Sequence, residues 1–306
     1  TLKNLIIKNA LNGAVSFVQP NAEYYLDNVT IQNSSSKYSY GGIELKAANL
    51  LVNNSKFISN TGTDSSDIFC NEKCNVTVEN STFEGGIESK WSHIYFSGGA
   101  LIVDGSTFAN SRSSYANAIY GEDGRVTVRN TKFRNLTVLN SAGAIGVKYA
   151  VNLTVEDCEF TNITSGKDGG VIFADIDQGY VTITNSKFHG CFAAFGSAVM
   201  QLRAELNIIN STFEDNIAMY DGGVLWTSYA DVSIENSTFK RNNIVKEDLE
   251  IGGVLYFDKG DILIKGSTFT DNHGSNKGDV VFTYDSKLTL QNNTFKDNGN
   301  ALYSVF

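Results

Sequence analysis

The carboxylates best suited to acid–base chemistry in this sequence are Asp175 and Asp177, which are two positions apart. Enzymes that cleave polysaccharides place several carboxylates, or a carboxylate with an Arg or Lys, together on one surface. At positions equivalent to this pair in the neighbouring repeats, we identify no acidic or basic partner, and acids recur only sporadically, as Glu122 and Asp258. We therefore expect a solvated surface here, no catalytic residue and no enzyme activity.

The three histidines, His93, His189 and His273, occupy different positions of the repeat described below. A metal site needs ligands that converge on one point, usually three or four of them. The sequence therefore predicts neither a metal site nor any other cofactor.

The four cysteines are too few for a disulfide scaffold. Cys70 and Cys74 flank a loop of three residues, and we predict a local disulfide between them, with two free surface thiols as the alternative. Cys158 and Cys191 occupy inward-facing repeat positions. We interpret them as small buried side chains, with a disulfide between them as the alternative.

The tripeptide Asn-x-Ser/Thr, the acceptor for N-linked glycans, occurs eleven times. Five of these asparagines belong to a turn column of the repeat, where we expect packing to hinder modification: Asn28, Asn80, Asn210, Asn236 and Asn292. The other six are predicted in loops or on outward positions and are our glycosylation candidates: Asn33, Asn53, Asn75, Asn135, Asn152 and Asn162.

The net charge of −9 and a pI near 4.9 argue against nucleic-acid partners and against anionic membranes, because both require a basic surface. No apolar run approaches the ~20 residues that cross a bilayer, so we predict no direct membrane insertion of this segment. An acidic, polar surface of this kind is typical of a secreted protein.

A repeat of the form Val-x-Ile-x-Asn-Ser-x-Phe runs through the whole chain with a period of about 26 residues. Ile31 occupies the aromatic position of an early copy. Aliphatic residues stand seven and five positions before the aromatic one, which is the period of a half-buried β-strand. The aromatic position of the later copies is occupied by Phe57, Phe83, Phe108, Phe133, Phe160, Phe188, Phe213, Phe239, Phe269 and Phe295.

Three positions before the aromatic residue, every copy has Asn, Asp or Gly, the residues that best tolerate left-handed backbone. Gly105 and Gly266 are the two glycines of this column. The column predicts a sharp turn that recurs once per repeat, at Asn28, Asn54, Asn80, Asn130, Asp157, Asn185, Asn210, Asn236 and Asn292.

Two further columns complete the repeat. A second strand begins with Gly-Gly and aliphatic residues, as in Gly169-Gly170-Val171. An asparagine follows the aromatic position by three residues, and stacked asparagines of this kind can hydrogen-bond along a ladder. This last column contains Asn60, Asn216, Asn242, Asn272 and Asn298.

A unit of 26 residues with short strands and no helical period cannot bury its own apolar face, but stacked units can. We therefore predict an all-β, single-stranded, right-handed parallel β-helix of the pectin-lyase-like type, with 11–12 coils. It forms one continuous domain over residues 1–306, which we interpret as part of a longer protein.

The combination of Gly222-Gly223-Val224-Leu225 with Phe213-Glu214-Asp215-Asn216 resembles the Gly-Gly-Ala-Ile and Phe-x-x-Asn repeats of polymorphic outer membrane proteins. Gly252-Gly253-Val254-Leu255 with Phe239-Lys240-Arg241-Asn242 is a second copy. The pattern is also similar to β-helix surface proteins of protists and archaea. The resemblance covers nearly the whole chain and implies a cell-surface or secreted role, often in adhesion.

Together these features predict an extracellular structural or adhesive surface protein, either a stalk or a fibre-forming subunit, that carries N-linked glycans. Its expected partners are further copies of itself, joined end to end, or cell-surface and matrix ligands. The alternative is a carbohydrate-binding or polysaccharide-cleaving β-helix with an aromatic or acidic stripe along one face. Such a stripe would draw on Tyr120, Tyr149, Trp226, Tyr229 and Tyr256.

Overall fold

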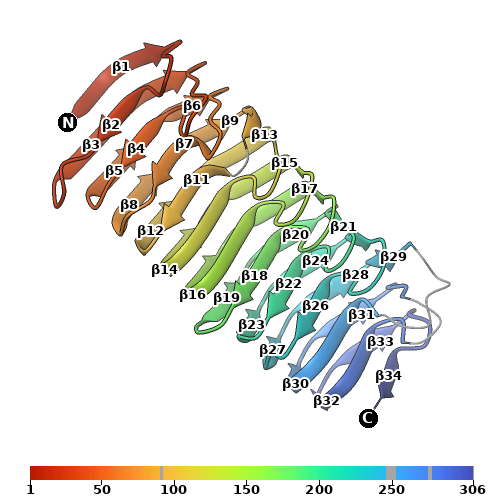
Figure 1. Cartoon of the computed structure of the whole chain (residues 1–306). Helices are drawn as coiled ribbons and strands as arrows, with labels where there is room; N and C mark the ends of the chain where they lie inside the picture. Colours follow the sequence, from red (N-terminus) through yellow and green to blue (C-terminus); the bar gives the residue numbers. More distant parts are fainter. Residues whose placement is uncertain (90–91, 246–252, 275–277, 306) are drawn as a thin grey trace.

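The computed structural model describes residues 1–89, 92–245, 253–274 and 278–305. These residues form 34 β-strands and no helix, and the coils stack into a rod with the two chain ends at opposite ends (Figure 1). The predicted all-β parallel β-helix is confirmed, with about 11 turns of ~26 residues. Among the described residues, no helix is long and apolar enough to cross a membrane. Gly252, from the last Gly-Gly pair, lies outside the described residues.

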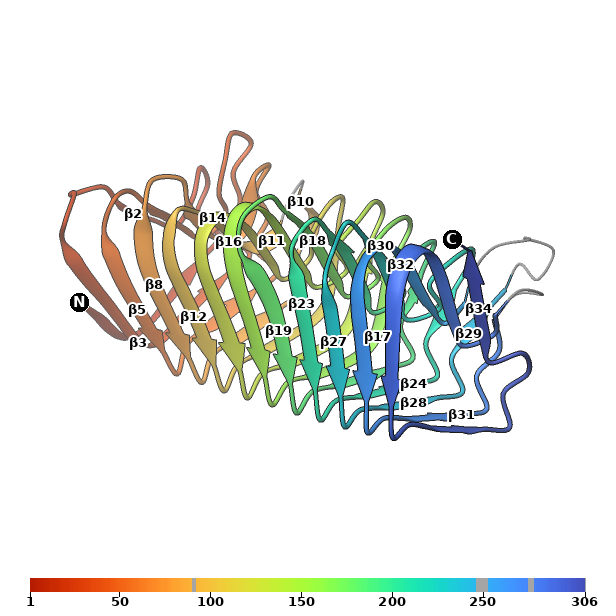
Figure 2. The same ribbon diagram turned by 90° about the horizontal axis from the view of Figure 1, so that it is seen from below.

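Each coil contributes to three parallel strand ladders, which run side by side along the rod (Figure 2). The first, here the aliphatic ladder, contains the alternating aliphatic columns of the repeat. Its strands are β1 (Leu2–Lys8), β3 (Glu23–Gln32), β5 (Asn49–Asn53), β8 (Cys74–Glu79), β12 (Gly99–Asp104), β14 (Ile119–Arg129), β16 (Ile145–Glu156), β19 (Tyr180–Thr184), β23 (Glu205–Ile209), β27 (Val232–Glu235), β30 (Leu255–Lys265) and β32 (Val281–Gln291).

The second, the phenylalanine ladder, begins at the C-terminal part of β3 and contains the repeated Phe. Its other strands are β6 (Lys56–Ile58), β9 (Thr82–Glu84), β10 (Ile87–Ser89), β13 (Thr107–Ser113), β15 (Lys132–Val138), β17 (Glu159–Ser165), β20 (Lys187–His189), β21 (Phe192–Ala193), β24 (Thr212–Glu214), β25 (Ile217–Ala218), β28 (Thr238–Lys240), β29 (Asn243–Ile244), β31 (Thr268–Thr270) and β33 (Thr294–Lys296).

The third, the glycine ladder, follows the Gly-Gly pairs, and the long strands β14, β16, β30 and β32 pass from it into the aliphatic ladder. Its remaining strands are β2 (Val15–Phe17), β4 (Ile43–Leu45), β7 (Ser65–Cys70), β11 (Ser92–Ser97), β18 (Ile172–Ile176), β22 (Val199–Leu202), β26 (Leu225–Ser228) and β34 (Leu302–Val305).

The Gly-Gly pairs serve two separate backbone requirements. The first glycine has left-handed backbone, as in Gly169 (φ +58°) and Gly222 (φ +63°). The second lies so close to the next coil that a side chain does not fit: a Cβ atom on Gly170 would overlap the carbonyl oxygen of Ser197. Glycine is the residue that satisfies both conditions without strain.

The core is organised around one continuous stack of phenylalanine rings. The ten rings from Phe57 to Phe295 lie nearly parallel, with neighbouring centroids 4.6–5.1 Å apart. Phe83 to Phe269 are completely buried or nearly so, and the aliphatic columns pack beside them. The spacing of the rings equals that of adjacent strands, so one Phe per coil fills the core without a gap.

The predicted turn column lies between the aliphatic and phenylalanine ladders, and we call it the asparagine corner. All of its members have left-handed φ angles between +47° and +60°, including Gly105 and Gly266. The serine that follows it faces inward. In most coils its hydroxyl donates to the carbonyl two residues earlier and accepts the backbone N–H of the preceding coil, as Ser211 does from Ser186.

The buried asparagine column beyond the Phe forms the predicted hydrogen-bonded ladder. Asn216, Asn242, Asn272 and Asn298 each accept from the preceding coil through Oδ1 and donate through Nδ2 to the carbonyl of a Phe one coil back. Where this position is apolar, as at Leu136 and Ile163, the strands β15 and β17 instead run on without a break.

Two further left-handed corners recur along the rod. The second corner lies two residues after each Phe and has φ angles between +51° and +73° at Asn33, Ser59, Gly85, Asn110, Asn135, Asn162, Gly190, Asp215, Arg241, Asp271 and Asp297. The third corner follows the glycine ladder, with φ between +31° and +72° at Ala47, Lys73, Gly98, Asp123, Tyr149, Arg203, Tyr229, Lys259 and Asp285.

Candidate binding face

The outward side of the glycine ladder contains an aromatic column that extends over much of the rod. Its members are register partners in successive coils, so each lies directly beside the next. We call this column and the adjacent third corner the lateral face. The column consists of Phe69, Tyr95, Tyr120, Gly146, Phe173, Met200, Trp226, Tyr256 and Phe282.

The rings of this column stack on one another along the rod axis. Trp226 and Tyr256 have centroids 5.7 Å apart and planes 3° apart, and Tyr256 and Phe282 have values of 5.2 Å and 7°. Phe69, Tyr95 and Tyr120 form a second stack at 5.1 and 5.9 Å. Because the ring faces cover each other, the column presents mainly ring edges to solvent.

Three of the five predicted stripe residues, Tyr120, Trp226 and Tyr256, therefore belong to one column. Tyr149 and Tyr229 instead occupy the third corner, where their side chains are 51% and 60% exposed. The structure thus brings the five onto one side of the rod, in two adjacent columns.

A carboxylate joins the first aromatic stack. The hydroxyls of Tyr95 and Tyr120 donate to opposite oxygens of Glu122, each at 3.1 Å. Burial, followed by the negative charge of Glu122, raises the pKa of both tyrosines well above the usual value. Both hydroxyls therefore remain neutral donors, and Glu122 is held in place by the pair.

The expectation that Asp175 and Asp177 lack a charged partner is wrong. Arg203, one coil further, forms ion pairs with both carboxylates, and its Nε lies 2.8 Å from Asp177. Glu122, Lys148 and Asp175 are also register partners in three successive coils. The residues around Asp175 carry variable loops, so counting from the Phe alone did not align them.

A second group of polar side chains lies by Trp226. Ser228 donates to Asp258 at 2.8 Å, and the ammonium group of Lys259 lies 2.7 Å from the hydroxyl of Tyr229 and 4.6 Å from the centre of its ring. In the loop before the strand, burial raises the pKa of Asp221 to about 6. Its Oδ1 is buried and has no hydrogen-bond partner among the described residues.

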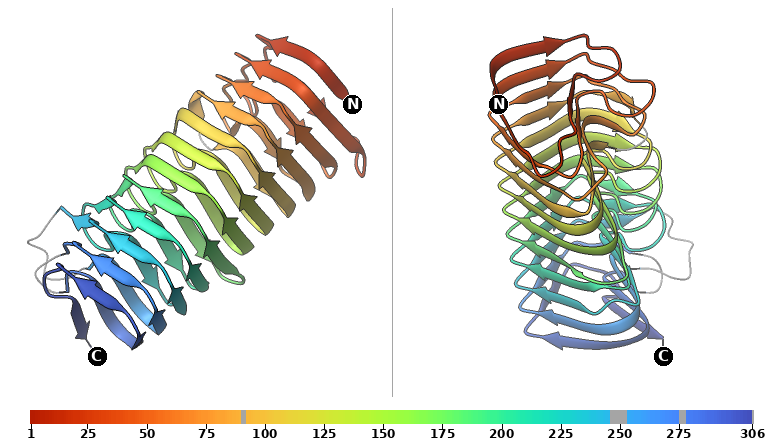
Figure 3. Two further views of the ribbon diagram at one scale, coloured as in Figure 1. Left: turned by 180° about the vertical axis from the view of Figure 1, so that it is seen from behind. Right: turned by 60° about the vertical axis from the view of Figure 1, so that its left-hand side comes forward.

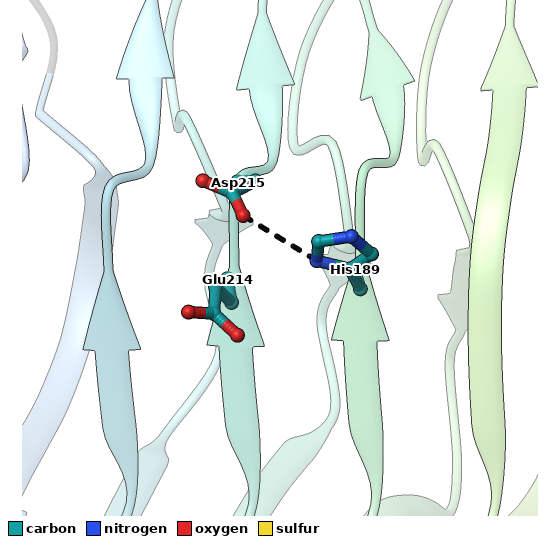
Figure 4. A group of neighbouring side chains, drawn as sticks. All are labelled: His189, Glu214 and Asp215. Atoms are coloured by element: carbon teal, nitrogen blue, oxygen red, sulfur yellow. Dashed lines mark ion pairs between the residues drawn. The ribbon is translucent and has the colours of Figure 1, made fainter.

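Away from the lateral face, His189 lies beside Glu214 and Asp215 at the second corner, with 3.5 Å between its Nδ1 and the nearer Asp215 oxygen (Figure 4). The three side chains converge enough to hold an ion, which the separation of the histidines in sequence did not predict. However, Arg241 already binds both carboxylates, at 2.6 Å from Glu214 and 2.7 Å from Asp215. We therefore interpret this group as an ion-pair network.

A buried polar pair also escaped the sequence analysis. Asp67 and His93, in adjacent coils, are 1% and 2% exposed and hydrogen-bond to each other through Nδ1. The other ring nitrogen lies 2.9 Å from the hydroxyl of Ser111, which donates onward to Asn117 at 2.6 Å. The serine proton thus points away from the histidine, so this buried chain lacks the geometry of an activated nucleophile.

The position of Asp67 and His93 identifies them as an exception within the core. Each precedes the inward Ile of its glycine-ladder strand, Ile68 or Ile94. In later coils the same position holds a small apolar residue, as at Ala118, Ala144, Val171 and Ala198. Alignment on that Ile, instead of on the Phe, would have revealed the pair.

The structure places the glycosylation candidates on the surface. Asn33, Asn135 and Asn162 are exposed at the second corner, Asn75 is exposed on β8, and Asn53 and Asn152 are half-buried on β5 and β16. The argument that packing shields the corner sequons is wrong, because the side chains of Asn28, Asn80, Asn210, Asn236 and Asn292 are also exposed. At a left-handed corner the backbone is bent inward and the side chain points outward.

Cys70 and Cys74 are joined by a disulfide across the third corner. Cys158 and Cys191 are free and almost completely buried, in the serine and asparagine columns respectively. Burial raises the pKa of both free thiols to about 12. They are inert packing residues, as the sequence position indicated.

The sequence matches the family model for a right-handed β-helix region over residues 66–239 and again over 176–305. The chain belongs to the right-handed β-helix family. The match supports the repeat family as such and does not single out the polymorphic outer membrane proteins. No curated protein matches this right-handed β-helix chain.

Two solved structures are similar to this β-helix. One is the surface protein and adhesin PfbA of Streptococcus pneumoniae, with 12% identity, a TM-score of 0.49 and coverage of 98% of this chain and 90% of that one. The other is a crystal structure of the same surface adhesin, with 13% identity, a TM-score of 0.41 and coverage of 98% and 85%.

Proposed function

We propose that the protein is an extracellular, non-enzymatic β-helical rod that acts in adhesion or as a structural element of a surface. The observation that carries the proposal is the state of the carboxylates on the lateral face. Glu122 is bound by two tyrosine hydroxyls, and Asp175 and Asp177 share the guanidinium of Arg203. Acids engaged in this way stabilise a surface and are poorly placed to exchange protons with a substrate.

Cell-surface and matrix molecules are the proposed partners, and N-linked glycans the proposed modification. The acidic net charge of −9 keeps such a rod soluble and disfavours nucleic acid. The exposed corner asparagines support the second point, since their side chains project from the coils at regular intervals.

Carbohydrate binding is the second candidate, favoured by the aromatic column of the lateral face. Sugar rings stack on aromatic faces, whereas Trp226, Tyr256 and Phe282 cover one another's faces. Lys259 lies over the ring of Tyr229. The geometry therefore favours the adhesive rod that contacts its partner through charged and hydroxyl groups.

The test is an adhesion assay with beads that carry the purified chain, applied to intact cells and to extracellular matrix layers. Adhesion above that of albumin-coated beads supports the proposal. Failure to adhere, together with release of sugars from acidic polysaccharides, would replace it with an enzyme. Electron microscopy of the native material, before and after deglycosylation, then distinguishes isolated stalks from regular fibres.

A further inference from the structure

The three left-handed corners differ in the residues that occupy them. Asparagine, aspartate and glycine fill every position of the asparagine corner and nearly every position of the second corner. The third corner contains Tyr149, Arg203, Tyr229 and Lys259, with φ angles of +54° to +70°. Left-handed backbone is uncommon for such bulky residues and carries strain that Asn or Gly avoids.

The repeat itself provides the comparison. The same bend is made by Asp123 and Asp285 in other coils of this corner, so the fold does not demand a long side chain there. Strain that persists where a less strained residue fits is typical of functional positions. The side chains are also accessible, with Tyr149 51% and Tyr229 60% exposed and the Arg203 side chain 48% exposed.

These side chains are held in place before any partner binds. Arg203 is fixed by Asp175 and Asp177, and Lys259 is fixed on Tyr229. Ordering of long side chains is a large part of the cost of association, and here that ordering is already present. Tyrosine and arginine are also the residues that most often dominate protein–protein binding energies.

We propose that this strip, which we call the recognition edge, binds a basic, extended segment of a protein partner along the rod axis. The inference rests on the proposed adhesive function and names the chemistry of its partner. Acids on the edge and beside it outnumber bases: Glu122, Asp123, Asp175, Asp177, Asp258 and Asp285 against Lys148, Arg203 and Lys259. Such a surface attracts lysine- and arginine-rich segments.

The dimensions suit an extended peptide. Tyr149 and Lys259 lie four coils apart, which corresponds to about 19 Å at the usual spacing of ~4.8 Å between strands. An extended chain rises ~3.3 Å per residue, so about six residues span the recognition edge. A glycan fits less well, because the ring faces of the neighbouring column are covered.

The experiment replaces Tyr149 and Tyr229 by asparagine, the residue that occupies most of the other corners. The probe is a fluorescein-labelled peptide of twelve lysines, titrated with the glycan-free chain at low and physiological salt. We expect binding at least tenfold weaker for Y149N/Y229N than for the natural chain, although the net charge is unchanged. We also expect a Tm about 2 °C or more higher, since corner strain is relieved.

Lys73→Asn is the matched control, because Lys73 occupies the third corner in a distant coil. It should keep oligolysine binding to within its loss of one charge. Equal binding by Y149N/Y229N and the natural chain, or binding of dextran in place of oligolysine, would overturn the recognition edge. Bead adhesion separates the two proposals: if Y149N/Y229N beads still adhere, the adhesive function stands and the edge is not its binding site.

Discussion

Substitution of Asn242 by alanine tests the buried asparagine ladder. Its Oδ1 accepts from the backbone N–H and the side-chain amide of Asn216, both at 3.0 Å. Its Nδ2 donates to the carbonyl of Phe213 at 2.9 Å and to Oδ1 of Asn272 at 3.0 Å. Both neighbours and Asn242 itself are completely buried, so water cannot replace these hydrogen bonds without opening the coil.

The magnitude follows from the groups left without partners. The side chains of Asn216 and Asn272 keep other hydrogen bonds, to Phe188 and to the backbone of residue 242. The backbone N–H of Asn216 and the carbonyl of Phe213 lose theirs, at about 1–3 kcal/mol each. A small cavity adds to this cost. We expect Asn242→Ala to lower the free energy of unfolding by about 4 kcal/mol.

Urea unfolding of the purified chain, followed by circular dichroism, measures this loss. Asn207→Ala is the control, because Asn207 lies on the outward side of β23 and its amide donates only to exposed Glu205. We expect less than about 0.5 kcal/mol there. Equal losses for the two variants would refute the reasoning, since the ladder would then contribute no more than a surface hydrogen bond.

The remaining predictions concern buried ionisable groups. His93→Ala should cost about 3–5 kcal/mol because it leaves the Asp67 carboxylate buried without its partner, whereas the double variant with Asp67→Ala should cost less than His93→Ala alone; a double-mutant cycle in urea measures both. Because the pKa of Asp221 is raised to about 6, the folded state binds more protons than the unfolded state between about pH 4 and 6, so stability falls as pH rises through that window. Asp221→Asn should remove this dependence in thermal melts from pH 4 to 8 and raise stability at pH 7 by about 1–2 kcal/mol, after a discount for partial exposure. Cys158 and Cys191, with pKa values of about 12, should react with iodoacetamide at pH 8 only after denaturation, and rapid labelling of the native chain would show that these coils open.

The sequence was sufficient to predict the fold because every coil repeats the same inward residues. The Phe, the two aliphatic columns and the Asn or Gly of the asparagine corner each have one structural task, so their types scarcely vary. The asparagine ladder could be predicted for the same reason. A column remains visible in a sequence when burial or left-handed backbone restricts it to a few residue types.

The lateral face was only partly predictable, and the reason is the loops. The number of residues between each Phe and the next Gly-Gly strand varies, so Arg203 did not align with Asp175 and His93 did not align with Asp67. The second corner was missed because serine and arginine interrupt its asparagines, as at Ser59 and Arg241. Outward positions are also free to vary, which leaves no column to recognise.

The strand register has a consequence for how such a chain can change its length. Each ladder joins a residue to its equivalent one coil away, and views along the rod show every coil in contact only with the next (Figure 3). Removal of residues 186–210 would join Asn185 to Ser211, where the natural sequence already has an asparagine followed by a serine. All three ladders, the phenylalanine stack and the corners would then remain in register, in a rod one coil shorter. Such a chain can gain or lose whole coils in evolution without a new core, so its reach from a surface can be adjusted independently of the residues that bind.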